Sequence, residues 1–166
     1  MDAGQKRYLE ERYSAKKWHG RSQYAKRTIT KFTFGGSEVR GWTIQRMERD
    51  ESVKPPVTHS FWSRSEASPE ILSIDLWECP SINTAHDQLL EVLANMQSGQ
   101  IERQTGTNAP GDVAFGLEDT MILFARVNLV VLIRNAGPQV VVVRAIAARI
   151  DAVLVKRLES DSRKKR

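Results

Sequence analysis

The chain has 166 residues, a length that fits one folded domain whose core needs neither disulfides nor metal. It carries 25 Lys and Arg against 20 Asp and Glu, and its single cysteine, Cys79, excludes an internal disulfide framework. Arg126, Arg134 and Arg144 interrupt the most apolar runs, so the sequence predicts no membrane span. The first twenty residues are charged throughout, and we therefore expect no signal peptide and a cytoplasmic location.

The charge is distributed unevenly along the chain. Residues 1–31 have nine Lys and Arg against three acids, a net +6, and residues 156–166 have six against two, a net +4. The middle of the chain, residues 32–155, is therefore −5. Basic ends on an acidic body indicate tails that contact an anionic partner, or tails whose charges only interact with solvent.

The N-terminal segment is rich in good helix formers. Tyr8, Leu9, Tyr13 and Trp18 form a loose apolar stripe between basic residues. Such a stripe docks a helix on its own domain, lies on a partner or a membrane surface, or binds single-stranded nucleic acid by stacking rings on bases while cations neutralise phosphate. The predicted anion-binding side chains of the two ends are Lys6, Arg7, Arg12, Lys16, Lys17, Arg163, Lys164, Lys165 and Arg166.

A hairpin is expected after this segment. Residues 28–34 alternate between two faces and lead into Gly35 and Gly36, which supply the positive φ angles of a tight turn. The return strand is predicted over 38–47.

Two further strands complete a predicted antiparallel meander. The charged and proline-containing stretch 48–56 indicates a loop. The strand over 57–64 places His59 and Phe61 on one face and Trp62 on the other, and the strand over 72–76 has one apolar face.

The hydrophobic period then changes to that of a helix. Ser81, Asn83 and Thr84 are candidate N-caps, and apolar residues recur at helical spacing until Gly99. The polar stretch 100–110 is predicted to be a loop.

The most apolar part of the chain follows this loop. Residues 113–117 predict a strand, and residues 120–135 predict either a hairpin that turns at Val127 and Asn128 or one long strand. We favour the hairpin, because asparagine tolerates left-handed geometry.

A C-terminal helix is predicted from Pro138 to Leu158. The elements together indicate an α+β fold, an antiparallel β-sheet of six to seven strands with two helices packed on one face and an additional N-terminal helix. We expect a basic N-terminal helix or arm over 1–27, a single domain over 28–158 and a basic tail over 159–166.

The one candidate nucleophile is Cys79. It follows a predicted strand and precedes a helix, whose dipole lowers a thiol pKa, and His86 lies in the early turns of that helix. The competing interpretation is a buried, inert cysteine, which Trp77 and Pro80 beside it favour.

We predict no metal and no cofactor. His19, His59 and His86 lack the spacing of a zinc site. Gly35 and Gly36 precede a strand, and so do not form the phosphate-binding start of a helix.

These observations favour a non-catalytic binding or assembly module that engages a protein partner. The aromatic residues proposed for its partner-binding face are Trp42, Phe61 and Trp62. The alternatives are binding of RNA or single-stranded DNA through the basic termini, and a cysteine-dependent activity at Cys79. An exposed strand edge could also support a homodimer. No motif is specific enough to assign a family.

Overall fold

The computed structural model describes residues 1–18, 24, 27–96 and 98–163. Its strands are β1 (Thr43–Asp50), β2 (Val57–Ser63), β3 (Ile71–Glu78), β4 (Glu102–Gln104), β5 (Val113–Leu117), β6 (Met121–Arg126) and β7 (Leu129–Asn135). Its helices are α1 (Ala3–Arg12), the short 3-10 helix η1 (Ala15–Lys17), α2 (Ile82–Met96) and α3 (Arg144–Arg163).

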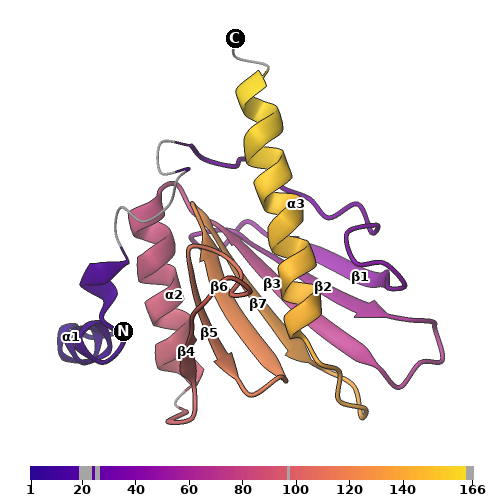
Figure 1. Ribbon diagram of the computed structural model, residues 1–166, viewed down its shortest axis with the longest axis horizontal. Coiled ribbons are helices and arrows are strands. Elements are labelled where there is room, and N and C mark those ends of the chain that lie inside the picture. Colours follow the sequence, from indigo (N-terminus) through magenta and orange to yellow (C-terminus); the bar gives the residue numbers. More distant parts are fainter. Residues whose placement is uncertain (19–23, 25–26, 97, 164–166) are drawn as a thin grey trace.

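The strands form one sheet in the order β1-β2-β3-β7-β6-β5-β4, and every neighbouring pair is antiparallel (Figure 1). The predicted α+β class and antiparallel sheet are therefore confirmed. The sequence of elements differs from expectation in two places, because 28–34 is not a strand and β4 lies within the expected loop 100–110.

Helices α2 and α3 cover opposite faces of the sheet, which corrects the expectation that both pack on one face. Strand β6 buries Ile122 and Phe124 against α3 and Leu123 and Ala125 in the cluster that contains α2. We call these two sides the α3 face and the α2 face. The reason is visible in the sequence of β6 and β7, where a continuous apolar run leaves no polar face for solvent. Figure 1 shows α3 crossing the sheet and α2 lying beside α1.

The segment 27–42 packs on the α3 face and contains no strand among its residues, so the predicted hairpin at Gly35 and Gly36 is wrong. Lys31 adopts a left-handed conformation with φ 54°, which breaks the alternation and lets Phe32 join Ile29 in the core. The backbone amides of Gly35 and Gly36 donate hydrogen bonds to the Glu38 carboxylate in place of a strand partner.

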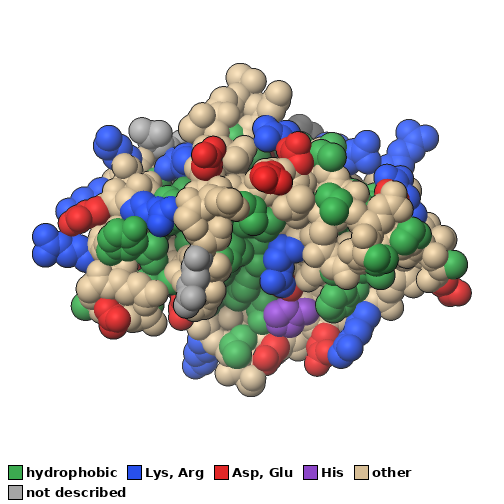
Figure 2. Space-filling model, turned by 90° about the horizontal axis from the view of Figure 1, so that it is seen from below, with side chains coloured by type: hydrophobic (Ala, Val, Ile, Leu, Met, Phe, Trp, Pro, Cys, Tyr) green, Lys and Arg blue, Asp and Glu red, His purple; other side chains and the backbone are tan. Residues whose placement is uncertain are grey.

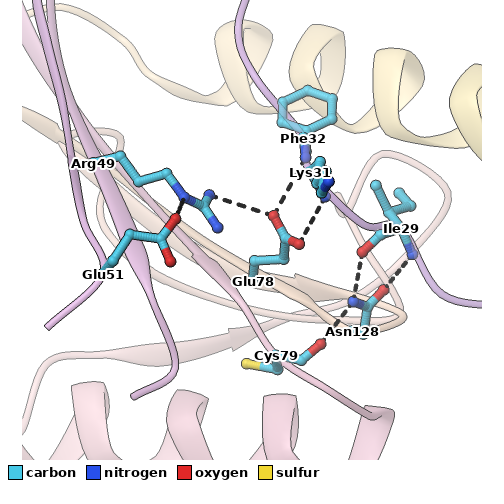
Figure 3. A network of polar contacts seen from close by, with 8 residues as sticks. All are labelled: Ile29, Lys31, Phe32, Arg49, Glu51, Glu78, Cys79 and Asn128. Carbon is cyan, nitrogen blue, oxygen red and sulfur yellow. Dashed lines mark hydrogen bonds and ion pairs between the residues drawn. The ribbon is translucent and has the colours of Figure 1, made fainter. Parts of the chain in front are cut away.

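One side chain of the β6–β7 turn and one of β3 hold this segment in place (Figure 3). The Asn128 amide accepts a hydrogen bond from the Ile29 N–H at 2.7 Å and donates to the Ile29 and Cys79 carbonyls at 2.8 and 2.7 Å. The Glu78 carboxylate accepts from the N–H groups of Lys31 and Phe32. These contacts satisfy backbone groups that a strand would have paired within the sheet.

The predicted turn at Val127 and Asn128 is confirmed, because β6 ends at Arg126 and β7 begins at Leu129. The left-handed residue, however, is Val127 with φ 52°. Its N–H donates to the Asp112 carboxylate at 2.7 Å, and Asn128 serves instead as the buried anchor described above.

The last helix begins later than predicted. Asn135 binds both the N–H and the carbonyl of Val141, so the valine-rich stretch after Pro138 is held outside the helix until Arg144. The predicted apolar spacing holds within α3, where Ile146, Ile150 and Leu158 are among the buried residues. The helix continues to Arg163, beyond the expected start of the tail.

A buried ion network joins α3 to the sheet. Arg126 on β6 donates to both carboxylate oxygens of Asp151 on α3, at 2.7 and 2.6 Å, and to Asp112 at 2.7 Å. Burial lowers the pKa of Arg126, but the hydrogen bonds and charges of Asp151 and Asp112 outweigh this effect and raise the pKa. Arg126 therefore stays charged within the fold.

The N-terminal helix docks on its own domain. Asp2 caps α1 by accepting a hydrogen bond from the Gln5 N–H at 2.8 Å, and Leu9 is buried with residues of α2. After η1, Trp18 packs edge-on against the His86 ring, with ring centroids 5.6 Å apart. Among the three interpretations of the N-terminal stripe, the structure therefore shows docking.

Candidate binding surface

One half of the α2 face carries no helix of the described chain. Helix α2 contacts β6 and β7, and α1 packs outside α2, so the side chains of β1 and β2 on this face, and those of β3 other than Trp77, lie beyond both helices. We call this surface the open face. Its side chains include Arg46 and Glu48 on β1, His59 and Phe61 on β2, Ile71, Ser73 and Asp75 on β3, and Arg134 on β7.

The burial pattern of β2 shows the difference between the two faces. Phe61 is 38% exposed, whereas its neighbour Trp62, on the α3 face, is 0% exposed. The α3 face of β2 and β3 is covered by α3 and by the segment 27–42. Figure 2 shows hydrophobic side chains on the floor of a hollow, with a histidine at the surface beside basic and acidic side chains.

The register of the strands arranges the open face in rows. Glu48, His59 and Asp75 are aligned across β1, β2 and β3. The next row aligns Arg46 and Phe61 with Ser73 and then Arg134. An aromatic ring therefore lies in a row that has an arginine on each side.

His59, Asp75 and Arg134 form a hydrogen-bonded cluster at the centre of this surface. The Asp75 carboxylate is bound to the His59 Nδ1 at 2.8 Å through Oδ1 and to the Arg134 guanidinium at 2.9 Å through Oδ2. The side chain of Asp75 is only 7% exposed, whereas those of His59 and Arg134 are 46% and 49% exposed. A buried carboxylate thus positions two half-exposed nitrogen-bearing groups.

Strand β1 adds charges at the border of the open face. Arg46 and Glu48 form an exposed ion pair at 2.8 Å. The pKa of Asp50 is lowered, first by hydrogen bonds from the Ser52 side chain and backbone and to a smaller extent by the charge of His59. The ion pair of Arg46 and Glu48 therefore balances part of the charge next to the cluster.

The aromatic residues predicted to bind a partner are separated by the structure. Phe61 lies on the open face, but Trp42 and Trp62 are buried in the core of the α3 face at 5% and 0% exposure. The prediction that Trp62 points away from His59 and Phe61 agrees with this placement. Trp42 and Trp62 line no surface of the described structure.

The basic residues of the N-terminus are partly neutralised within the chain. Lys6 is paired with Asp87 at 2.7 Å, and Arg7 with Glu11 at 3.0 Å. Arg12 donates to the Gly99 carbonyl at 3.1 Å. Lys16 and Lys17 are exposed and line a hollow of about 540 Å³ that also contains acidic side chains. The side chain of Arg163 and residues 164–166 lie outside the described part.

Cys79 does not have the properties of a nucleophile. The thiol is 2% exposed, and burial, helped by the charge of Glu78, raises its pKa to about 12. A thiol with this pKa is protonated at neutral pH, and the thiolate is the reactive form. His86 is buried against Trp18. The structure therefore favours the inert cysteine.

Sequence reasoning missed Asp75 and Arg134. The sequence of β3 alternates apolar Leu72, Ile74 and Leu76 with residues of the other face, which is a signal for a second, partly polar face. The pairing of β3 with β7 has no such signal, because Asp75 and Arg134 are 59 positions apart.

Among the residues that the structure describes, no group of three or more His, Cys, Asp and Glu side chains is placed to hold a metal ion. No described helix is long and apolar enough to cross a membrane. Comparisons of the chain with protein-family models, with curated proteins and with solved structures found no match.

Proposed function

We propose that the protein is a non-catalytic binding module that engages a protein partner through the open face. The observation that carries this proposal is the exposed position of Phe61. The opposite face of the sheet is covered by α3 and the segment 27–42, and the neighbouring part of the same face is covered by α2. An aromatic side chain that remains exposed next to fixed polar groups is typical of an interface centre.

The polar groups of the open face support binding more than catalysis. Asp75 uses each of its carboxylate oxygens to hold one neighbour, and Ser73 is buried between Phe61 and Arg134 in the register. Groups held in this way provide hydrogen bonds of fixed direction at a small entropic cost. They suit a surface that recognises one partner.

The basic termini give little support to the alternative, which is nucleic-acid binding. Lys6 and Arg7 already have acidic partners, and the body 32–155 has a net charge of −5, which repels a polyanion. Fewer unpaired Lys and Arg side chains are therefore available to bind nucleic acid than the sequence indicates.

The test is site-specific photo-crosslinking. A photoreactive phenylalanine analogue is introduced at Phe61, and in a matched control at Val140, which is 66% exposed and follows β7. We expect one protein to be crosslinked from position 61 and not from position 140. That protein is then purified and titrated against the native chain and Phe61→Ala, and we expect the variant to bind at least about tenfold more weakly, as for a central interface residue.

Two results would contradict the proposal. Equal crosslinking from positions 61 and 140 would show that the open face is not selective. Unchanged affinity of the purified partner for Phe61→Ala would show that the contact lies elsewhere. A crosslink to a second copy of this chain, with a dimer in sedimentation, would identify the partner as the protein itself.

A further inference from the structure

Strand β1 forms a long, uncovered edge of the sheet (Figure 1). It spans eight residues, whereas β4 at the other edge spans three. Within the described part of the chain β1 pairs only with β2, and residues 45–49 are all exposed. Every second residue of such a strand directs its N–H and C=O groups away from the sheet, so β1 has backbone groups that are free to pair with another strand.

The side chains of β1 restrict which strand can pair there. Arg46 and Glu48 lie on the open face as an exposed ion pair, and Met47 between them is 41% exposed on the other side of the strand. Opposite charges that face each other across two strands stabilise the pairing, and like charges destabilise it. Charges on an edge strand therefore oppose pairing with most strands and permit it with a strand of matching pattern.

A second copy of β1 matches this pattern in one register. Two identical antiparallel strands pair about a two-fold axis that passes through one residue position. With Met47 on the axis, Arg46 of each copy lies opposite Glu48 of the other, and no like charges are opposed. An axis at position 46 opposes two arginines, and an axis at position 48 opposes two glutamates. An axis at position 49 again opposes two arginines and places Glu48 opposite Asp50 twice.

The irregularity of β1 also favours the axis at Met47. The register with β2 shifts between Ile44 and Arg46, which leaves Gln45 without a partner position on β2, as in a β-bulge. An axis at Gln45 would put both irregular residues at the centre of the paired strands. The axis at Met47 puts them towards the ends, where they interrupt the pairing less.

We infer that two copies of the chain pair through β1, antiparallel and about a two-fold axis at Met47, so that their sheets join into one. The inference goes beyond the proposed function, because it concerns the edge of the sheet and not the open face. It has a consequence for the open face, since the row of Phe61 and Arg46 continues into Glu48 and His59 of the second copy. The dimer therefore presents two open faces on the same side of one sheet.

The test is a pair of charge reversals, followed by sedimentation of the full chain over a concentration series. Arg46→Glu opposes acidic side chains twice across the axis, and Glu48→Arg opposes basic side chains twice. We expect the native chain to dimerise as its concentration rises, and each variant to dimerise at least about tenfold more weakly. An equimolar mixture of the two variants restores opposite charges at both positions, so the mixture should form a heterodimer with about the native affinity.

The control for this mixture reverses an exposed ion pair elsewhere in the molecule. Arg144 and Asp119 are each 53% exposed and lie away from β1. Arg144→Glu and Asp119→Arg should each dimerise like the native chain. Every variant is first shown to unfold at the same temperature as the native chain, which these exposed positions allow.

A cysteine on the axis tests the register. Directly opposite residues of an antiparallel pair have Cβ atoms about 4.5–5.5 Å apart, close to the separation that a disulfide needs. Because Cys79 is buried, Met47→Cys should form a disulfide-linked dimer through the new thiol on mild oxidation. The matched control is Val53→Cys, which is 42% exposed but lies six positions from the axis in each copy, and it should stay unlinked.

Three results would overturn the inference: a native chain that is monomeric at every concentration, a dimer that neither charge reversal weakens, or equal crosslinking of Met47→Cys and Val53→Cys. Two variants that stay apart when mixed would also overturn it. If the native chain is monomeric while crosslinking from position 61 identifies another protein, the inference fails and the proposed function stands. If the charge reversals behave as expected while position 61 crosslinks no protein, the inference stands and the proposed function fails.

Discussion

Asn128 is a single side chain that joins three parts of the chain. It makes three hydrogen bonds to the backbone of Ile29 and Cys79 and is 1% exposed. Replacing it with Ala leaves an N–H and two carbonyls buried without these partners, and each such group costs about 1–3 kcal/mol. We expect Asn128→Ala to lower the free energy of unfolding by about 3 kcal/mol, measured by denaturant titration.

The control for this prediction is Asn108→Ala, which removes the same side chain from an exposed loop position. Its free energy of unfolding should stay within about 0.5 kcal/mol of the native value. Similar losses in the two variants would show that the hydrogen bonds of Asn128 do not stabilise the fold.

Cys79 offers a second test at the scale of one residue. With a pKa of about 12 and a buried position, its thiol should not react with iodoacetamide at pH 8 until the chain is denatured. Because the pKa rises from 9.0 on folding, the contribution of the thiol to stability is present below pH 9 and is lost as the pH rises towards 12. Labelling of the native protein at pH 8, measured by mass spectrometry, would contradict the burial of this thiol.

At the scale of elements, two ion pairs join α3 to the rest of the molecule. Arg126 and Asp151 are each 13% exposed, whereas Arg144 and Asp119 are each 53% exposed. Removing one partner of a buried pair leaves a buried charge without a partner and lowers the free energy of unfolding by about 3–5 kcal/mol, whereas an exposed pair contributes about 0–1 kcal/mol. We expect Asp151→Ala to destabilise the protein several times more than Asp119→Ala in thermal or denaturant unfolding, and equal effects would contradict the structural role of this network.

The same scale shows what the sequence could predict. Strands β2, β3 and β5 and helix α2 have local patterns, and the structure confirms them near the expected residues. The stretch 28–34 has an equally good strand pattern, but Asn128 and Glu78 bind its backbone from distant positions, so it packs as an irregular segment. The open face follows the same rule: Phe61 and His59 are predictable from β2 alone, whereas Arg134 joins them only through the pairing of β3 with β7.

For the whole molecule, the two cores share one sheet. The α3 face contains Trp42 and Trp62, the α2 face contains Trp18, and β6 and β7 contribute buried side chains to both. If β6 and β7 left one core, the buried side chains of the other core would also be exposed. We therefore expect a single cooperative unfolding transition. Far-UV circular dichroism and tryptophan fluorescence should give the same denaturation midpoint, and two separate midpoints would show that the cores unfold independently.

The position of the last turns of α3 has a practical consequence. Leu158 is the last buried residue that the structure describes, and Ser160, two positions further along α3, is exposed. Helix α3 packs on the face opposite the open face, and its end extends past the sheet (Figure 1). Because Cys79 is buried, a cysteine introduced by Ser160→Cys would be the reactive thiol for a maleimide dye or a biotin linker. A chain attached to a sensor surface through this position would present the open face to the solution, which is the orientation that a direct measurement of partner binding requires.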